Sequence, residues 1–123
     1  MSDVLDPEAA RRLHRIGGTR LLQGMIELFL EHAPARLAAA DAALAAGALA
    51  EAERAWHSLK SSAGNLGAIR LQTAAGQAEG AAAAGDGAAA AAAGIAVKRE
   101  CPVAEAALRC LWQELRDADD RGD

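Results

Sequence analysis

The sequence LAEAERAWHSLKSSAGNL, residues 49–66, has the apolar spacing of one face of an α-helix. Its apolar positions recur every three or four residues, at Leu49, Ala52, Ala55, Leu59, Ala63 and Leu66. At about 100° per residue, His57 lies on the opposite side of the helix from Ala55, Leu59, Ala63 and Leu66. The segment therefore predicts a helix that buries one face and presents the imidazole of His57 to solvent.

The chain before this segment predicts two helices separated by a glycine pair. Residues 6–8, Asp-Pro-Glu, form a helix start signal: an N-cap acceptor, a proline at the first helical position and an acid in the first turn. A short helix is expected from there to Arg15, ended by glycines 17–18. A long helix follows and closes at Gly47, and Pro34 inside it is expected to cause a kink because it removes a backbone donor.

The chain after residue 66 predicts two more helices. One covers residues 69–84 and ends at Gly85, and Asp86 can cap the next. Residues 80–94 are nearly all Ala and Gly and could form a low-complexity linker, but the helix propensity of Ala and the capping signal favour helix. Pro102 is expected to kink the last helix.

Composition selects the fold class. Alanine dominates, β-branched residues are sparse and aromatic residues make up 2% of the chain, so a β-sheet is not expected. Short connections make neighbouring helices antiparallel. We therefore expect an all-α, antiparallel up-down-up-down four-helix bundle with a short extra N-terminal helix across one end. A single domain should span residues 1–123, with its core at about 6–116 and a frayed polar tail at 117–123.

Charge and hydropathy exclude several classes of protein. The net charge is −4 and the Lys and Arg residues are dispersed, which argues against binding to nucleic acid. No run of about 18 apolar residues predicts a membrane span, and residues 1–3 do not resemble the start of a signal peptide. We expect a cytoplasmic, monomeric protein whose partners are proteins.

The cysteines and acidic residues give no metal site in the sequence. Cys101 and Cys110 fall in one predicted helix, about half a turn of azimuth apart, so they cannot pair with each other and are expected to be free, buried thiols. No Glu stands three residues before a His, as a di-iron helical bundle would require. No cofactor is expected. The chain also lacks a Gly-rich phosphate loop and the length for a nucleotide-binding domain, so autonomous kinase activity is not expected.

The helix face around His57 is built of small residues and one cation. Lys60, Ser61, Gly64 and Ala68, at offsets of three, four, seven and eleven residues, are expected to project to the same side as His57. A neutral imidazole is a nitrogen nucleophile at neutral pH, and small neighbours leave it accessible to an in-line phosphoryl group. Lys60 can offset charge on the phosphoryl oxygens. The pattern suits a reversible phosphoryl carrier.

Residues 55–68, AWHSLKSSAGNLGA, resemble the signature of the histidine-containing phosphotransfer (Hpt) domain family. The similarity extends more weakly over residues 5–115. It implies that His57 is the phospho-acceptor, through its outer ring nitrogen, and that Lys60 assists. Glu79 falls where the family often places a Gln or Glu near the imidazole, which would orient the ring; as a solvated surface acid it would have no role, and the sequence leaves both open.

The sequence departs from the family pattern at two positions. Ser61 stands where the family commonly has Gly, and Ala78 stands where it commonly has Leu. Serine is small enough to keep the imidazole accessible, so the first departure hardly affects the assignment. The second departure, Ala in place of Leu at residue 78, mainly reduces the apolar side-chain volume in the local core.

The resemblance also implies partners. It implies that His57 takes a phosphoryl group from a receiver-domain aspartate and passes it to another receiver domain, with a hybrid histidine kinase upstream and Mg²⁺ held only by the partner receiver. The alternative is a phosphate-independent adaptor that docks receiver or kinase domains. An apolar docking patch could be formed by Leu13, Ile16, Leu21 and Met25, although these residues could equally belong to the core.

Overall fold

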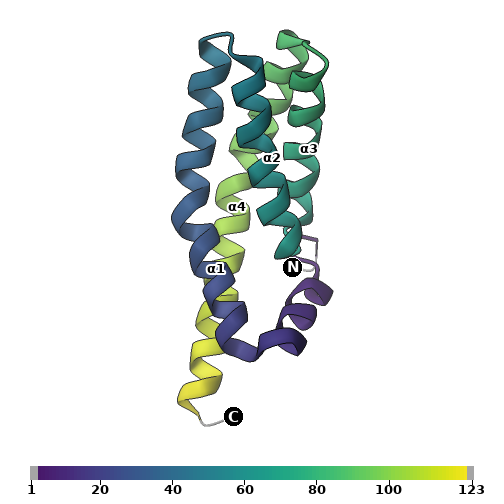
Figure 1. Ribbon diagram of the computed structural model, residues 1–123. Helices are drawn as coiled ribbons and strands as arrows, with labels where there is room; N and C mark the ends of the chain where they lie inside the picture. The colour runs from purple at the N-terminus through teal and green to yellow at the C-terminus, as the bar shows by residue number, and fades with distance from the viewer. Residues whose placement is uncertain (1–2, 122–123) are drawn as a thin grey trace.

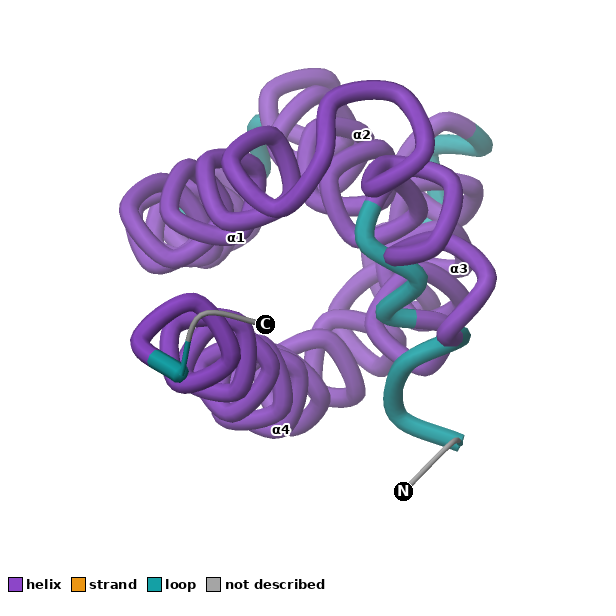
Figure 2. The backbone as a smooth tube through the Cα atoms, turned by 90° about the horizontal axis from the view of Figure 1, so that it is seen from below, coloured by secondary structure: helices purple, strands orange, loops and turns teal. Residues whose placement is uncertain are grey.

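The protein is an antiparallel bundle of helices in the computed structural model (Figure 1). Over residues 3–121, which the structure describes, the chain forms four helices: α1 (Pro7–Ala45), α2 (Leu49–Asn65), α3 (Ile69–Ala83) and α4 (Gly87–Asp120). Each helix packs against its two neighbours, and α4 also packs against α1. Figure 2 shows the helices following one another around the bundle in the order α1, α2, α3, α4. The predicted all-α, up-down-up-down architecture is confirmed.

The turns between helices follow the capping signals in the sequence. After α2, Gly67 adopts a left-handed conformation with φ of 73°, and the Ala68 N–H donates to the carbonyl of Ala63 across 2.8 Å. The start of α4 is capped as expected, because the side chain of Asp86 accepts a hydrogen bond from the Ala89 N–H at 3.0 Å. The Ala- and Gly-rich segment 80–94 is helical on both sides of this turn.

The expectation of a separate short N-terminal helix is wrong. Residues Pro7–Ala45 count as one helix, α1, but two helical segments meet in it at a kink at Gly18, whose dihedrals are non-helical (φ 72°, ψ −166°). Glycine adopts this positive φ at little steric cost, so the chain turns at Gly18 and helix resumes directly after it. The first segment of α1 therefore turns across the lower end of the bundle (Figure 1). There, the Asp6 N–H donates to the carbonyl of Gly67 across 2.7 Å.

The other helix features agree in part with expectation. Pro34 and Pro102, expected to kink their helices, both lie inside helices whose backbone is not broken at these positions. Residues 117–120, expected as part of a frayed tail, belong to α4, which ends only at Asp120. A hydrogen bond of 2.9 Å from the Gln113 side chain to Asp117 supports this last stretch, since residues four apart are neighbours on a helix.

The core is built from alanines around a small number of large side chains. The largest fully buried side chains are Trp56, Ile26, Leu59, Leu71, Leu108, Val97 and Cys101. Gly94 faces Trp56 so closely that a Cβ atom there would lie 3.2 Å from the indole Cζ2. The tryptophan immediately before His57 thus anchors α2 to α4 and fixes the rotation of α2 about its axis.

The expectation of two buried thiols holds only for Cys101. Cys101 is buried and Cys110 is exposed. Nine residues along a helix correspond to about half a turn, so the two side chains point to opposite sides of α4. Burial raises the pKa of the Cys101 thiol to about 11. Within residues 3–121, none of the helices is long and apolar enough to span a membrane.

Candidate functional site

His57 lies on the outer side of α2, next to α3. Its side chain is 59% exposed, as the sequence predicts. The Nδ1 atom lies 2.6 Å from Oε2 of Glu79, which extends from α3. An ionised carboxylate can only accept in this contact, so Nδ1 is the donor, and in the neutral imidazole the outer nitrogen, Nε2, then keeps its lone pair. The nucleophilic nitrogen is the one that faces away from Glu79.

Glu79 also binds Lys60. Its second oxygen, Oε1, lies 2.6 Å from the Lys60 Nζ atom, and its side chain is 17% exposed. The hydrogen bond from Lys60 lowers the pKa of Glu79 most, burial opposes this effect, and the hydrogen bond from His57 lowers the pKa further. The carboxylate is therefore ionised at neutral pH. The sequence left open whether Glu79 reaches the imidazole, and the structure places it in contact with both His57 and Lys60.

Glycines at the α2–α3 interface bring these three side chains together. A Cβ atom on Gly76 of α3 would lie 3.3 Å from Cδ of Lys60, so the lysine stem passes over this glycine. A Cβ atom on Gly64 of α2 would lie 2.8 Å from the Gln72 side-chain nitrogen. Gly64 is thus a helix-packing position. Its small size makes room for the Gln72 side chain, and this contact, more than access to His57, explains the glycine.

The other residues expected on the small face separate into two groups. Ser61 is exposed, one turn beyond His57 on the same side. The assignment of Ala68 to this face is wrong, because Ala68 is fully buried. The helix ends at Asn65, so the 100° step cannot be extended to residue 68, which instead precedes the first residue of α3.

An open depression surrounds the imidazole. It has a volume of about 490 Å³ and is lined by Glu53, Arg54, His57, Ser58 and Glu79. The sequence interpretation did not include Arg54, although its position three residues before His57 places it on the same helix face. The depression leaves space beside the imidazole for a transferred group. Among residues 3–121, no group of His, Cys, Asp and Glu side chains is arranged to hold a metal ion.

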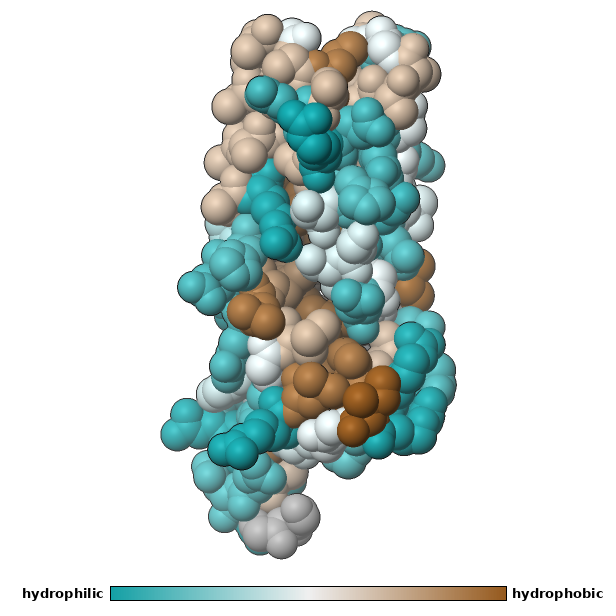
Figure 3. Space-filling model, in the orientation of Figure 1, coloured by the Kyte–Doolittle hydropathy of each residue, from teal (hydrophilic) through white to brown (hydrophobic). Residues whose placement is uncertain are grey.

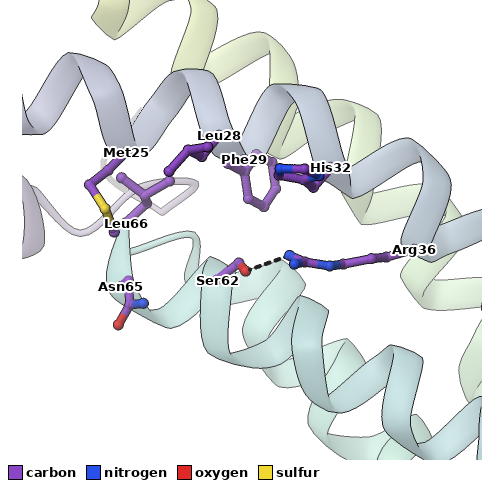
Figure 4. A pocket seen from close by; sticks show the side chains of 8 residues that line it. All are labelled: Met25, Leu28, Phe29, His32, Arg36, Ser62, Asn65 and Leu66. Atoms are coloured by element: carbon purple, nitrogen blue, oxygen red, sulfur yellow. Dashed lines mark hydrogen bonds between the residues drawn. The ribbon is translucent and has the colours of Figure 1, made fainter.

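A second depression lies between α1 and α2 (Figure 4). It has a volume of about 300 Å³ and an apolar floor with a polar rim: Met25, Leu28, Phe29, Leu66, His32, Arg36, Ser62 and Asn65. Arg36 donates a hydrogen bond of 3.1 Å to the Ser62 hydroxyl across the rim. Leu28, which the sequence interpretation did not single out, is 53% exposed. We call this depression the α1–α2 groove.

The apolar residues expected to dock partners have different environments. Leu13 and Met25 are partly buried and pack against the core, and Met25 also lines the α1–α2 groove. Leu21 is half-buried, whereas Ile16 is 71% exposed. Apolar side chains gather in the lower half of the face seen in Figure 3, near the end of α2 and the N-terminal part of α1.

Comparison with known proteins agrees with this geometry. The model of the Hpt domain family matches residues 24–118. The chain belongs to the Hpt domain family. Hpt domains are histidine phosphotransfer modules of phosphorelays and generally interact with receiver domains, so this Hpt protein is a phosphoryl carrier.

The fold is similar to that of a solved Hpt structure. The crystal structure of histidine-containing phosphotransfer protein B (HptB) from Pseudomonas aeruginosa PAO1 matches with a TM-score of 0.85 and 23% sequence identity. The match covers 93% of this chain and 98% of that chain. Among curated proteins, none matches this sequence. The family match begins at residue 24, so the segment of α1 before the bend at Gly18 lies outside it.

Proposed function

We propose that His57 accepts a phosphoryl group on Nε2 from a receiver-domain aspartyl phosphate and later passes it to the aspartate of another receiver domain. The contact between Nδ1 and Glu79 at 2.6 Å carries this proposal. It holds the proton on the inner nitrogen, so the outer nitrogen of the neutral ring keeps its lone pair for attack, and the ring itself lines the open depression.

The transfer balances without movement of a proton. The Nε2 lone pair forms the new N–P bond, the P–O bond of the aspartyl phosphate breaks, and the aspartate leaves as a carboxylate with that electron pair. The imidazole becomes cationic as the N–P bond forms, because Nδ1 keeps its hydrogen. Glu79, ionised and in contact with Nδ1, stabilises this positive charge. The reverse steps deliver the phosphoryl group to the next aspartate.

Lys60 assists through its charge. Its ammonium group binds Glu79 and keeps the carboxylate ionised and oriented toward the ring. Its positive charge, one helical turn from His57, also offsets negative charge on the phosphoryl oxygens. Ser61 leaves the outer side of the ring accessible.

Receiver domains of response regulators and of a hybrid histidine kinase are the proposed partners. The transfer needs Mg²⁺ only on the receiver. The α1–α2 groove, with exposed Leu28 beside Met25, supplies apolar surface for docking such a domain, and Ile16 adds an exposed apolar side chain. Transient phosphotransfer complexes require docking that is specific yet reversible, which a small groove with a polar rim suits.

The test is transfer from a phosphorylated receiver domain to wild-type protein and to His57→Gln. We expect acid-labile phosphate on the wild type and none on the variant. His14→Gln is the matched control, because His14 is also exposed but lies in the N-terminal part of α1. Both variants should keep the helical circular dichroism of the wild type, since neither ring is buried.

Two outcomes would overturn the proposed carrier role. Undiminished labelling of His57→Gln would place the phosphoryl group elsewhere. A wild-type protein that binds receivers but takes up no phosphoryl group would favour the adaptor function instead.

A further inference from the structure

The depression around His57 contains a cation that the proposed transfer does not use. Arg54 lies three residues before His57 on α2, where side chains are neighbours on one helix face. Both side chains line the same depression of about 490 Å³. Of the five residues that line it within the described part of the chain, Arg54 is the one permanent cation, beside the acids Glu53 and Glu79.

Lys60 is not free to bind a phosphoryl group directly. Its Nζ atom lies 2.6 Å from Oε1 of Glu79, and its side chain is only 37% exposed. Its stem is seated over Gly76, with Cδ 3.3 Å from the position of a Cβ atom there. Turning the ammonium group toward the phosphoryl oxygens would break a charge-assisted hydrogen bond and leave Glu79 with less compensation for its burial.

Arg54 has no such commitment. Its side chain is exposed, and within residues 3–121 it has neither an ion-pair nor a hydrogen-bond partner. The adjacent acid, Glu53, points about 100° away around the helix, which keeps the two side chains from pairing. The guanidinium group can therefore move within the depression without losing an existing interaction.

We propose that Arg54 binds the phosphoryl group on His57 directly, donating two parallel N–H bonds to two phosphoryl oxygens. The inference rests on the proposed function of His57. A phosphoryl group on a ring nitrogen is multiply negative near neutral pH, and the planar guanidinium fork matches the spacing of two such oxygens. Lys60 then contacts Glu79 and acts on the phosphoryl oxygens only through its charge at a distance, while Arg54 contacts the phosphoryl group itself.

The experiment uses phosphoramidate, a small donor that phosphorylates the ring nitrogen with loss of ammonia and needs no receiver domain. We compare wild type with Arg54→Gln and Arg54→Lys. Arg12→Gln is the matched control, since Arg12 is exposed and lies in the N-terminal segment of α1, outside the depression. Two quantities are measured: the initial rate of labelling, and the pKa of the phosphoryl group by ³¹P NMR titration.

Arg54→Gln should label about three- to tenfold more slowly and should raise the pKa of the bound phosphoryl group by about half a unit, the size of effect an exposed ion pair gives. Arg54→Lys should restore part of both effects, because it returns the charge without the fork. Arg12→Gln should behave as wild type.

The outcomes separate this inference from the proposed function. If wild type takes up no phosphoryl group from any donor, the role of His57 fails. If wild type is labelled but Arg54→Gln has the same phosphoryl pKa, direct contact by Arg54 is refuted, whatever the labelling rate.

Discussion

Glu79→Gln tests the electrostatic part of the mechanism. Glutamine has nearly the same size as glutamate and still offers an oxygen to the Nδ1 hydrogen, but it carries no charge. The present contact is short, at 2.6 Å, and the Glu79 side chain is mostly buried. A hydrogen bond to a charged group contributes about 1.5–3 kcal/mol, against about 0.5–1.5 kcal/mol for a neutral pair. The difference, about 1–1.5 kcal/mol, acts only as the ring becomes cationic, so transfer should slow about tenfold.

The assay is single-turnover transfer from a phosphorylated receiver domain, quenched at intervals and measured as acid-labile phosphate. Glu53→Gln is the matched control. Glu53 lines the same depression but makes no hydrogen bond to His57, and its substitution removes the same charge. A rate for Glu79→Gln within twofold of wild type would refute the role of the carboxylate. Equal slowing of both variants would show that general charge near the site matters, and not the contact with Nδ1.

The pH dependence of stability gives a second view of the same carboxylate. The pKa of Glu79 is lowered from its ordinary value of 4.5, chiefly by the hydrogen bond from Lys60. A carboxyl group whose pKa is lower in the folded state than in the unfolded state stabilises the protein at pH values above its unfolded-state pKa. This stabilisation is lost as the pH falls toward and through its folded-state pKa. The stability difference between wild type and Glu79→Gln, measured by urea unfolding, should therefore be constant above pH 4.5 and shrink below it.

Two further predictions concern regions away from the imidazole. Gly67→Ala should lose more stability to urea than Gly47→Ala, by about 1–3 kcal/mol: both glycines have φ of 73°, but only at Gly67 would a Cβ atom meet the Asp6 carbonyl, at 2.6 Å. Equal losses would contradict the packing of the N-terminal segment against this turn. At pH 7.5, a thiol reagent should modify Cys110 quickly and Cys101 only on unfolding, because Cys101 is buried and has a raised pKa. Rapid modification of both cysteines in the native protein would contradict this prediction.

The sequence predicts those features of the fold that depend on local interactions. The apolar spacing on residues 49–66 places His57 outward, and the capping signal at Asp86 starts α4, because both effects arise within one or two helical turns. At residues 17–18 the glycine pair predicts the position of the kink, but not that α1 continues through it as one element. A glycine pair is a strong stop signal, yet a single left-handed residue can be followed at once by more helix, which depends on where the next segment packs.

The arrangement of side chains around His57 could not be predicted without knowing how the helices pack against each other. Helical projection placed Ala68 beside His57, but the projection holds only as far as the helix, which ends at Asn65. The contact between Glu79 and the imidazole depends on the register of α3 against α2, which the packing of Gly64 on Gln72 and of Lys60 on Gly76 determines. Spacing along one helix carries no information on that register.

The reaction centre is contiguous in the chain. Every side chain that lines the depression around His57, together with Lys60, belongs to residues 53–79, a single helical hairpin formed by α2, its turn and α3. Contacts between segments so near in sequence require little loop-closure entropy, so the hairpin can assemble before the long helices α1 and α4 enclose it. It is therefore a portable unit: grafted onto another antiparallel bundle with a small-residue seam, it would carry the nucleophile, the carboxylate and both cations with it.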